Sequence, residues 1–114
     1  MSIGEYHQCS DETLDLIVEN LEAIGDETEI DGFDVEYSQG VMTLKLGAHG
    51  TYVINKQPPN QQIWLSSPKS GPKRYDYDKE SNKWFYHRDN HTLDGLLNEE
   101  LSEALGQPID VLAH

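Results

Sequence analysis

Three predicted strands follow one another in residues 41–67, which read VMTLKLGAHGTYVINKQPPNQQIWLSS. The period of two is clearest in Met42, Leu44 and Leu46, and alternation of this kind is typical of a half-buried strand. The Pro-Pro-Asn-Gln sequence at 58–61 is typical of a hairpin connection. We therefore expect consecutive antiparallel strands over 41–46, 51–57 and 62–67.

Helical periodicity flanks this block of strands. Upstream, apolar residues recur at intervals of three and four over 14–24, which places them on one face of a helix, and Gly25 is the expected terminator. Downstream, Thr92 is a typical N-cap, a leucine-rich face follows it, and Gly106 is a typical helix end. Each helix thus offers one apolar face to a core.

Shorter strands complete the segment between the helices. Val35 and Tyr37 form a brief alternation, and two prolines and a glycine predict an irregular connection over 67–72. A second hairpin is expected over 74–77 and 83–87. The order helix, antiparallel strands, helix predicts an α+β fold, a two-layer α/β sandwich with both helices on one face of the sheet and solvent on the other.

The composition excludes several classes of protein. A length of 114 residues, with 36% of them hydrophobic, predicts one domain that spans residues 1–114. A formal charge of -13 opposes contact with phosphate backbones, so we expect no nucleic-acid partner. No apolar run approaches the roughly 20 residues of a membrane span, so no membrane partner is expected. Cys9 is the single cysteine, which excludes an intrachain disulfide.

Acidic residues are concentrated near the N-terminus, where 12 of the 21 lie between Glu5 and Glu36. Helical spacing places several of them on a face separate from the apolar one. Together with two residues near the first strand they form the set that we call the acidic ridge: Asp11, Asp15, Glu19, Glu22, Asp26, Asp31 and Asp34. Carboxylate ligands suit hard cations, including iron. A basic protein surface is a competing ligand, and a merely solvated helix face is the structural alternative.

A second candidate site lies on the expected solvent face of the sheet. If Ile63 points to the core, alternation directs Gln62 and Trp64 to the other face, and the neighbouring strand adds Asn55 and Gln57 there. A tryptophan among amides on an uncovered sheet is typical of a protein-binding hot spot. The alternative is that Trp64 is covered, either by the 67–72 connection or by a stacked arginine at position 74.

The same residues carry a family resemblance. Residues 50–68 read GTYVINKQPPNQQIWLSSP and residues 70–76 read SGPKRYD, and together they resemble the signature of the frataxin family, in its eukaryotic form. The acidic first helix, the Gly40–Leu44 segment and the leucine-rich last helix follow in the family's order, so the resemblance covers almost the entire chain. It implies a frataxin-like sandwich, α-β(5–6)-α, with two near-parallel helices packed on the sheet.

The resemblance also implies a function. Frataxins assist iron–sulfur cluster assembly in the mitochondrial matrix, bind the complex of a cysteine desulfurase and the scaffold protein, and promote sulfur transfer. They also bind ferrous and ferric iron weakly at the acidic ridge. By matching positions, the partner-binding residues implied here are Asn55, Gln57, Gln62, Trp64 and Arg74. We expect a non-enzymatic activator or iron chaperone that acts as a monomer, with an iron-dependent oligomer as the alternative.

Two other functions stay open. One is a ferroxidase or iron store that oxidises Fe²⁺ on the ridge, and the other is an acidic interaction module that uses no metal. The presequence that mitochondrial import requires is not among the 114 residues, so the chain is expected to correspond to a mature form.

Overall fold

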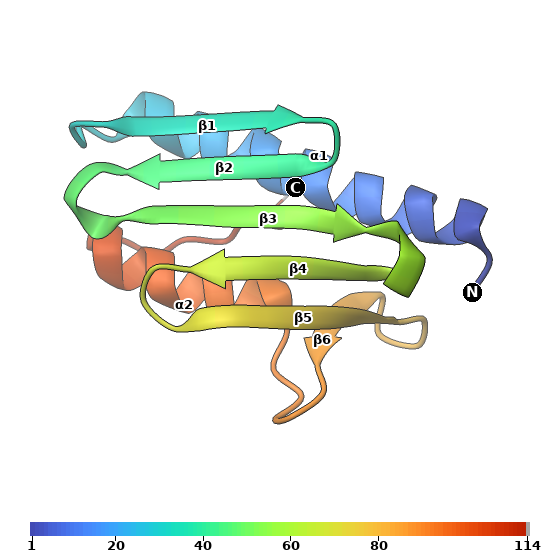
Figure 1. The fold of residues 1–114 in the computed structure, drawn as a ribbon. Coiled ribbons are helices and arrows are strands. Elements are labelled where there is room, and N and C mark those ends of the chain that lie inside the picture. Colours follow the sequence, from blue (N-terminus) through green and yellow to red (C-terminus); the bar gives the residue numbers. More distant parts are fainter. Residues whose placement is uncertain (114) are drawn as a thin grey trace.

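Six strands pair in the order in which they occur along the chain, each antiparallel to the next, in a computed structural model that describes residues 1–113. The helices are α1 (Ile3–Glu27) and α2 (Leu93–Leu105). The strands are β1 (Phe33–Ser38), β2 (Val41–Leu46), β3 (Thr51–Gln57), β4 (Gln62–Ser67), β5 (Gly71–Asp78) and β6 (Lys83–Tyr86). Both helices lie behind the sheet and leave its other face uncovered (Figure 1). The predicted two-layer α+β sandwich is confirmed.

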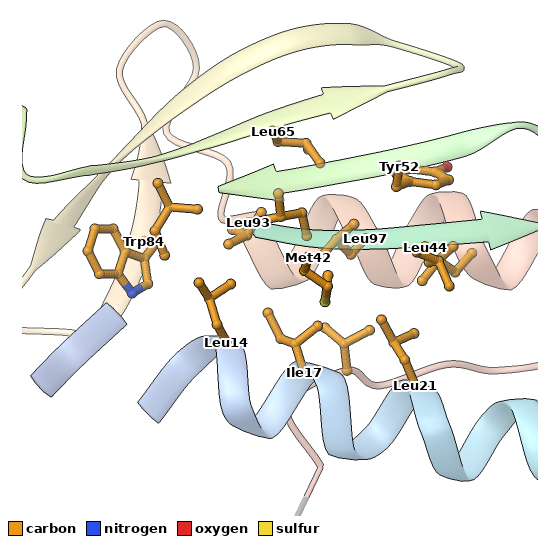
Figure 2. Close-up of a cluster of buried hydrophobic side chains, with 14 of the residues drawn as sticks. Leu14, Ile17, Leu21, Met42, Leu44, Tyr52, Leu65, Trp84, Leu93 and Leu97 are labelled. Atoms are coloured by element: carbon orange, nitrogen blue, oxygen red, sulfur yellow. The ribbon is translucent and has the colours of Figure 1, made fainter. Parts of the chain in front are cut away.

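The core lies between the helices and the sheet. Leu14, Ile17 and Leu21 of α1 are buried, and Figure 2 shows them pointing toward Met42 of β2 and Leu97 of α2. Strands β2, β3 and β4 alternate buried and accessible residues, as the period of two predicts. Burial of these apolar side chains, at roughly 25 cal/mol per Å² removed from water, is the main stabilising contribution.

Helix α1 is longer than its apolar pattern predicts. It begins after Ser2, whose side chain accepts a hydrogen bond from the Glu5 amide while the Glu5 carboxylate accepts one from the Ser2 amide, a reciprocal cap. It continues through Gly25 to Glu27, so the predicted termination at Gly25 is wrong. The glycine is required by packing instead, because a Cβ atom there would lie 2.4 Å from the Phe33 ring of β1.

The connection predicted over 67–72 is shorter than expected. Gly71 and Pro72 already belong to β5, where Pro72 pairs with Ser66 of β4, so the irregular part is confined to the three residues between the strands. Pro72 is tolerated in the strand because an antiparallel pair leaves some amides without a ladder bond. Helix α2 is as predicted: Thr92 accepts from the Gly95 amide and Gly106 ends the helix in the left-handed region.

The segment after α2 closes the groove between the helices. Val111 is fully buried, and its backbone carbonyl accepts from Asn20 Nδ2 of α1 at 2.7 Å while its amide donates to Asn98 Oδ1 of α2 at 2.8 Å. Ile109 is buried beside it. Ile109 and Val111, beyond α2, therefore belong to the core, which the helical pattern did not indicate. Within residues 1–113, neither helix is long and apolar enough to cross a bilayer.

Candidate functional site

The register of the sheet brings the five predicted partner-binding residues together on the face opposite the helices, which we call the outer face. Asn55 of β3 pairs with Trp64 of β4, and Trp64 pairs with Arg74 of β5, so these residues form one row across three strands. Gln57 pairs with Gln62 in the next row. Residues separated by up to 19 positions in sequence thus form one surface, because register fixes which outward side chains are neighbours.

Trp64 is held in place by its neighbours in these rows. Its indole Nε1 donates to Gln62 Oε1 at 2.9 Å, and Gln62 Nε2 donates to Asp76 Oδ1 at 3.1 Å. The Arg74 guanidinium lies over the indole, with Cζ 4.6 Å from the ring centroid. The stacking that the sequence left as an alternative is therefore present. It orders the tryptophan, which remains partly accessible, and it does not cover the whole face.

Asp76 was missed as a contributor to this site. It lies in the hairpin predicted over 74–77 and 83–87, and its carboxylate fixes the orientation of the Gln62 amide and through it the indole. The second oxygen of Asp76 lies 3.6 Å from His87 Nε2. Knowledge of the β4–β5 register, in which Ile63 faces Tyr75, would have revealed this neighbour. Side-chain hydrogen bonds thus order the part of the outer face around Trp64.

The acidic ridge is less uniform than its spacing predicts. Asp15, Glu19, Glu22, Asp26, Asp31 and Asp34 are exposed. Asp11 differs, since its Oδ1 accepts from Lys56 Nζ of β3 at 2.6 Å, and the same nitrogen lies 2.8 Å from His7 Nδ1. The Lys56 side chain is only 11% exposed, so this pair is partly shielded from solvent. Asp11 is therefore engaged by a cation of the chain itself and contributes less to the ridge than its neighbours.

The ridge does not form a closed metal site. Among the described residues, no three His, Cys, Asp or Glu side chains converge closely enough to hold a metal ion. A hard cation that meets Asp15 or Glu19 would keep water on most of its coordination positions. The same two carboxylates border an open groove of about 990 Å³ whose other wall carries Asp94 and Asp110. The arrangement suits loose attraction of cations rather than tight chelation.

Glu100 is a buried carboxylate that the sequence did not reveal. It lies on α2 and is 7% exposed. Its Oε1 accepts from the hydroxyls of Tyr52 at 2.8 Å and Ser67 at 2.7 Å, and its Oε2 accepts from Ser70 at 2.6 Å. Burial alone would raise the pKa of Glu100, but the hydroxyl donors outweigh it, so the pKa is lowered from its ordinary value. This network ties α2 to β3, to β4 and to the connection before β5.

Comparison with known proteins agrees with this geometry. The frataxin-like domain family matches residues 1–107. Among curated proteins, mitochondrial frataxin of Arabidopsis thaliana is 50% identical over 94% of this chain and 57% of its own length. The mitochondrial frataxin homolog of Schizosaccharomyces pombe is 49% identical over 93% of this chain and 67% of its own. The chain thus spans a little over half to two thirds of the length of these relatives.

Solved structures of frataxins also match this chain. Trimeric frataxin of Saccharomyces cerevisiae, complexed with ferrous iron, superposes with a TM-score of 0.77 at 45% identity, covering 87% of this chain and 87% of that one. Frataxin from Psychromonas ingrahamii has a TM-score of 0.80 over 97% of this chain and 98% of that one; at 24% identity it supports the fold alone.

The fold and the outer face define a small two-layer α/β sandwich with one uncovered sheet face, on which a tryptophan is held by a stacked arginine. The chain belongs to the frataxin family. Its curated relatives are named as mitochondrial proteins, which confirms the expected mitochondrial localisation.

Proposed function

We propose that this protein is an accessory factor of iron–sulfur cluster assembly in the mitochondrial matrix. It binds the complex of cysteine desulfurase and scaffold protein through the outer face and promotes sulfur transfer. The observation that carries this proposal is the row formed by Asn55, Trp64 and Arg74, with the indole hydrogen-bonded to Gln62. An ordered aromatic side chain loses little conformational freedom on binding, which favours affinity.

Trp64 is the central contact of the proposed interface. Tryptophan and arginine dominate protein-binding hot spots, where truncation to alanine costs about 2 to 4 kcal/mol. The face around it is rich in amides and carries little charge, which suits a large folded partner. Val41, 42% exposed at the β2 end of the same row, adds apolar area.

The direct test is a reconstituted cluster-assembly reaction with desulfurase, scaffold and iron. We expect the wild-type chain to accelerate assembly and Trp64→Ala to abolish the acceleration, with the fold retained because the side chain points away from the core. Thr51→Ala, an exposed outward residue at the far end of β3, is the matched control and is expected to behave as the wild type. Full activity of Trp64→Ala, or a large fall in its melting temperature, would contradict the proposal.

The acidic ridge is the proposed binding site for iron, which the protein would carry as cargo. A yeast relative is complexed with ferrous iron in a solved structure, and the exposed carboxylates of this chain attract cations without forming a closed site. We propose weak binding of Fe²⁺ or Fe³⁺ by one or two ridge carboxylates, with water as the remaining ligands. One chain provides a complete outer face, so a monomer suffices for the proposed activity. The trimeric state of the yeast protein keeps an iron-dependent oligomer as the alternative.

A ferroxidase or store is the second candidate function, and the same iron site favours it. The two functions differ in their requirement for a partner. Oxygen consumption with Fe²⁺ alone, lost in the triple variant Asp15→Asn, Glu19→Gln, Glu22→Gln and unchanged in Trp64→Ala, would support the ferroxidase. Loss of assembly in Trp64→Ala without oxygen consumption in any variant would support the accessory factor. Normal assembly by the triple variant without iron binding would support an interaction module that uses no metal.

A further inference from the structure

The two arginines of this acidic chain have no acidic partner. Four of its six lysines, at positions 56, 69, 79 and 83, form ion pairs with carboxylates, whereas Lys45 and Lys73 form none among the described residues. Within residues 1–113, neither Arg74 nor Arg88 has a carboxylate oxygen within 4.0 Å, although the chain contains 21 acidic residues. Both side chains are exposed. The guanidinium groups therefore retain donors that the chain itself does not satisfy.

Both arginines border the same hollow at the β5–β6 margin of the sheet. The hollow has a volume of about 380 Å³, and Gln62, Asp76 and His87 line it together with the arginines. The hollow adjoins the outer face, since Arg74 stacks on Trp64. Asp76 does not neutralise the arginines, because one of its oxygens accepts from Gln62 and the other faces His87. Lys73 also lines the hollow, and its Nζ donates to the backbone oxygen and the hydroxyl of Ser70. A site with two unpaired guanidinium groups thus continues the outer face beyond the five predicted residues.

We propose that this hollow binds the carboxylates of an acidic segment in the protein partner, with Arg74 and Arg88 each pairing with a carboxylate. This inference rests on the proposed function, because it extends the same interface and names the chemistry of the segment that it meets. The planar guanidinium matches a carboxylate with two parallel hydrogen bonds. Arg88 is the new member of the interface, and it lies at its rim.

The observations favour a carboxylate segment over a phosphate chain. A guanidinium can pair with either group. Asp76 inside the hollow, however, opposes a dianionic phosphate more strongly than a single carboxylate, and the net charge of -13 repels a long phosphate backbone more than a short acidic stretch. The neighbouring amides and indole also suit a folded protein surface. A short acidic stretch on a protein is therefore the occupant.

The first test measures association with the purified desulfurase–scaffold complex at several salt concentrations. We expect Arg88→Glu to raise the dissociation constant about tenfold or more, chiefly through a slower association rate, and to reduce its salt dependence. Lys45→Glu reverses the same charge at an exposed position on β2, toward the opposite edge of the same sheet face, and is the matched control, with an expected change below about twofold. Equal effects of the two variants would overturn the inference.

The second test identifies the chemical group. In Arg88→Lys the introduced amine can be coupled to a neighbouring carboxylate by a carbodiimide, which leaves an amide bond that mass spectrometry locates. We expect a crosslink from position 88 to an Asp or Glu of the partner and none from Lys45. Complex formation without a crosslink from position 88 would overturn the assignment of a carboxylate.

The Trp64→Ala variant distinguishes failure of the proposed accessory function from failure of the acidic-segment inference. If it no longer binds while Arg88→Glu and Lys45→Glu bind equally well, the accessory function stands and the acidic-segment inference fails. If Trp64→Ala binds as the wild type, the proposed interface itself is wrong, and the inference that rests on it fails as well. Retained binding of a nucleic acid by the chain, lost in Arg88→Glu, would assign the hollow to phosphates.

Discussion

Glu100 shows at the scale of one residue how a charge can be stabilised inside this fold. An unpaired carboxylate in an apolar core would be protonated or would destabilise the fold. Here the hydroxyls of Tyr52, Ser67 and Ser70 donate to it, so the ionised form is favoured and the pKa is lowered. The Tyr52 hydroxyl is correspondingly held protonated, since burial and then the bond to Glu100 raise its pKa.

Glu100→Gln tests this account through the pH dependence of stability. A lowered pKa in the folded state contributes stability above the ordinary value of 4.5, and that contribution is lost as the pH falls through the lowered value. We expect the variant to be about 1 to 2 kcal/mol less stable near pH 7, because neutral hydrogen bonds replace charge-assisted ones. Denaturant unfolding between pH 3 and pH 7 should show the two stability curves converging toward the acid end, where the wild type loses this contribution.

The control for this experiment is the neighbouring residue. Glu99 is exposed, and Glu99→Gln should follow the wild-type curve at every pH. A constant difference between Glu100→Gln and the wild type across the pH range would show that the loss comes from packing and not from the charge.

At the scale of an element, the contact between α1 and β1 decides where the acidic ridge lies. Gly25 allows the Phe33 ring to approach the last turns of α1. This approach brings the end of α1 against β1, the edge strand of the sheet. The ridge carboxylates of α1 lie on an adjacent face of the same helix, with Glu22 three positions before Gly25 and Asp26 one after it, so their position depends on a residue that carries no side chain.

Gly25→Ala is expected to destabilise the protein by about 1 to 3 kcal/mol. Its methyl group would collide with the Phe33 ring, and overpacking outweighs the gain in helix propensity. Gly4→Ala is the matched control, because its Cβ would meet only Ser2 Oγ at 4.0 Å. That variant should gain up to about 1 kcal/mol. Thermal unfolding of both variants measures the contrast, and equal stabilisation by the two alanines would refute the packing argument.

At the scale of the whole molecule, a net charge of -13 is distributed unevenly. The ridge residues on α1 lie three or four positions apart and repel one another, at a few tenths of a kcal/mol per pair. The basic residues begin only at Lys45, and four of them are already paired with carboxylates. One side of the protein therefore presents a strong negative field, while the outer face is nearly neutral and ends in two unpaired arginines.

The triple variant Asp15→Asn, Glu19→Gln, Glu22→Gln should therefore be more stable than the wild type. We expect its melting temperature to rise by about 2 to 5 °C at low ionic strength and the difference to shrink in about 0.5 M salt, where charges are screened. Isothermal titration with Fe²⁺ under anaerobic conditions should show weaker binding by the variant. The double variant Glu80→Gln, Glu99→Gln, which removes two dispersed exposed charges, should change both properties little. A melting temperature below that of the wild type would indicate that the ridge has a structural role.

The local pattern of the chain determined the fold class and most of the outer face. The spacing of the apolar residues predicted α1, α2 and the central strands. Periods of 3.6 residues in a helix and 2 residues in a strand follow from backbone geometry alone. The same alternation correctly placed Ile63 inward and Trp64 outward. The N-cap at Thr92 and the helix end at Gly106 could also be predicted from the sequence, since each depends on residues within one turn of the helix end.

Only the tertiary structure decided which distant side chains meet. Lys56 donates to Asp11, 45 positions away in the sequence, and Asp76 orients Gln62 across the β4–β5 pair. Glu100 accepts hydrogen bonds from hydroxyls of two strands and a turn. No local periodicity encodes these pairs, because they depend on strand register and on how α1 and α2 pack against the sheet. The sequence by itself therefore determined the elements and the direction in which their side chains point. Long-range packing decided which carboxylates are neutralised, which remain exposed on the ridge, and that neither arginine has a carboxylate neighbour within residues 1–113.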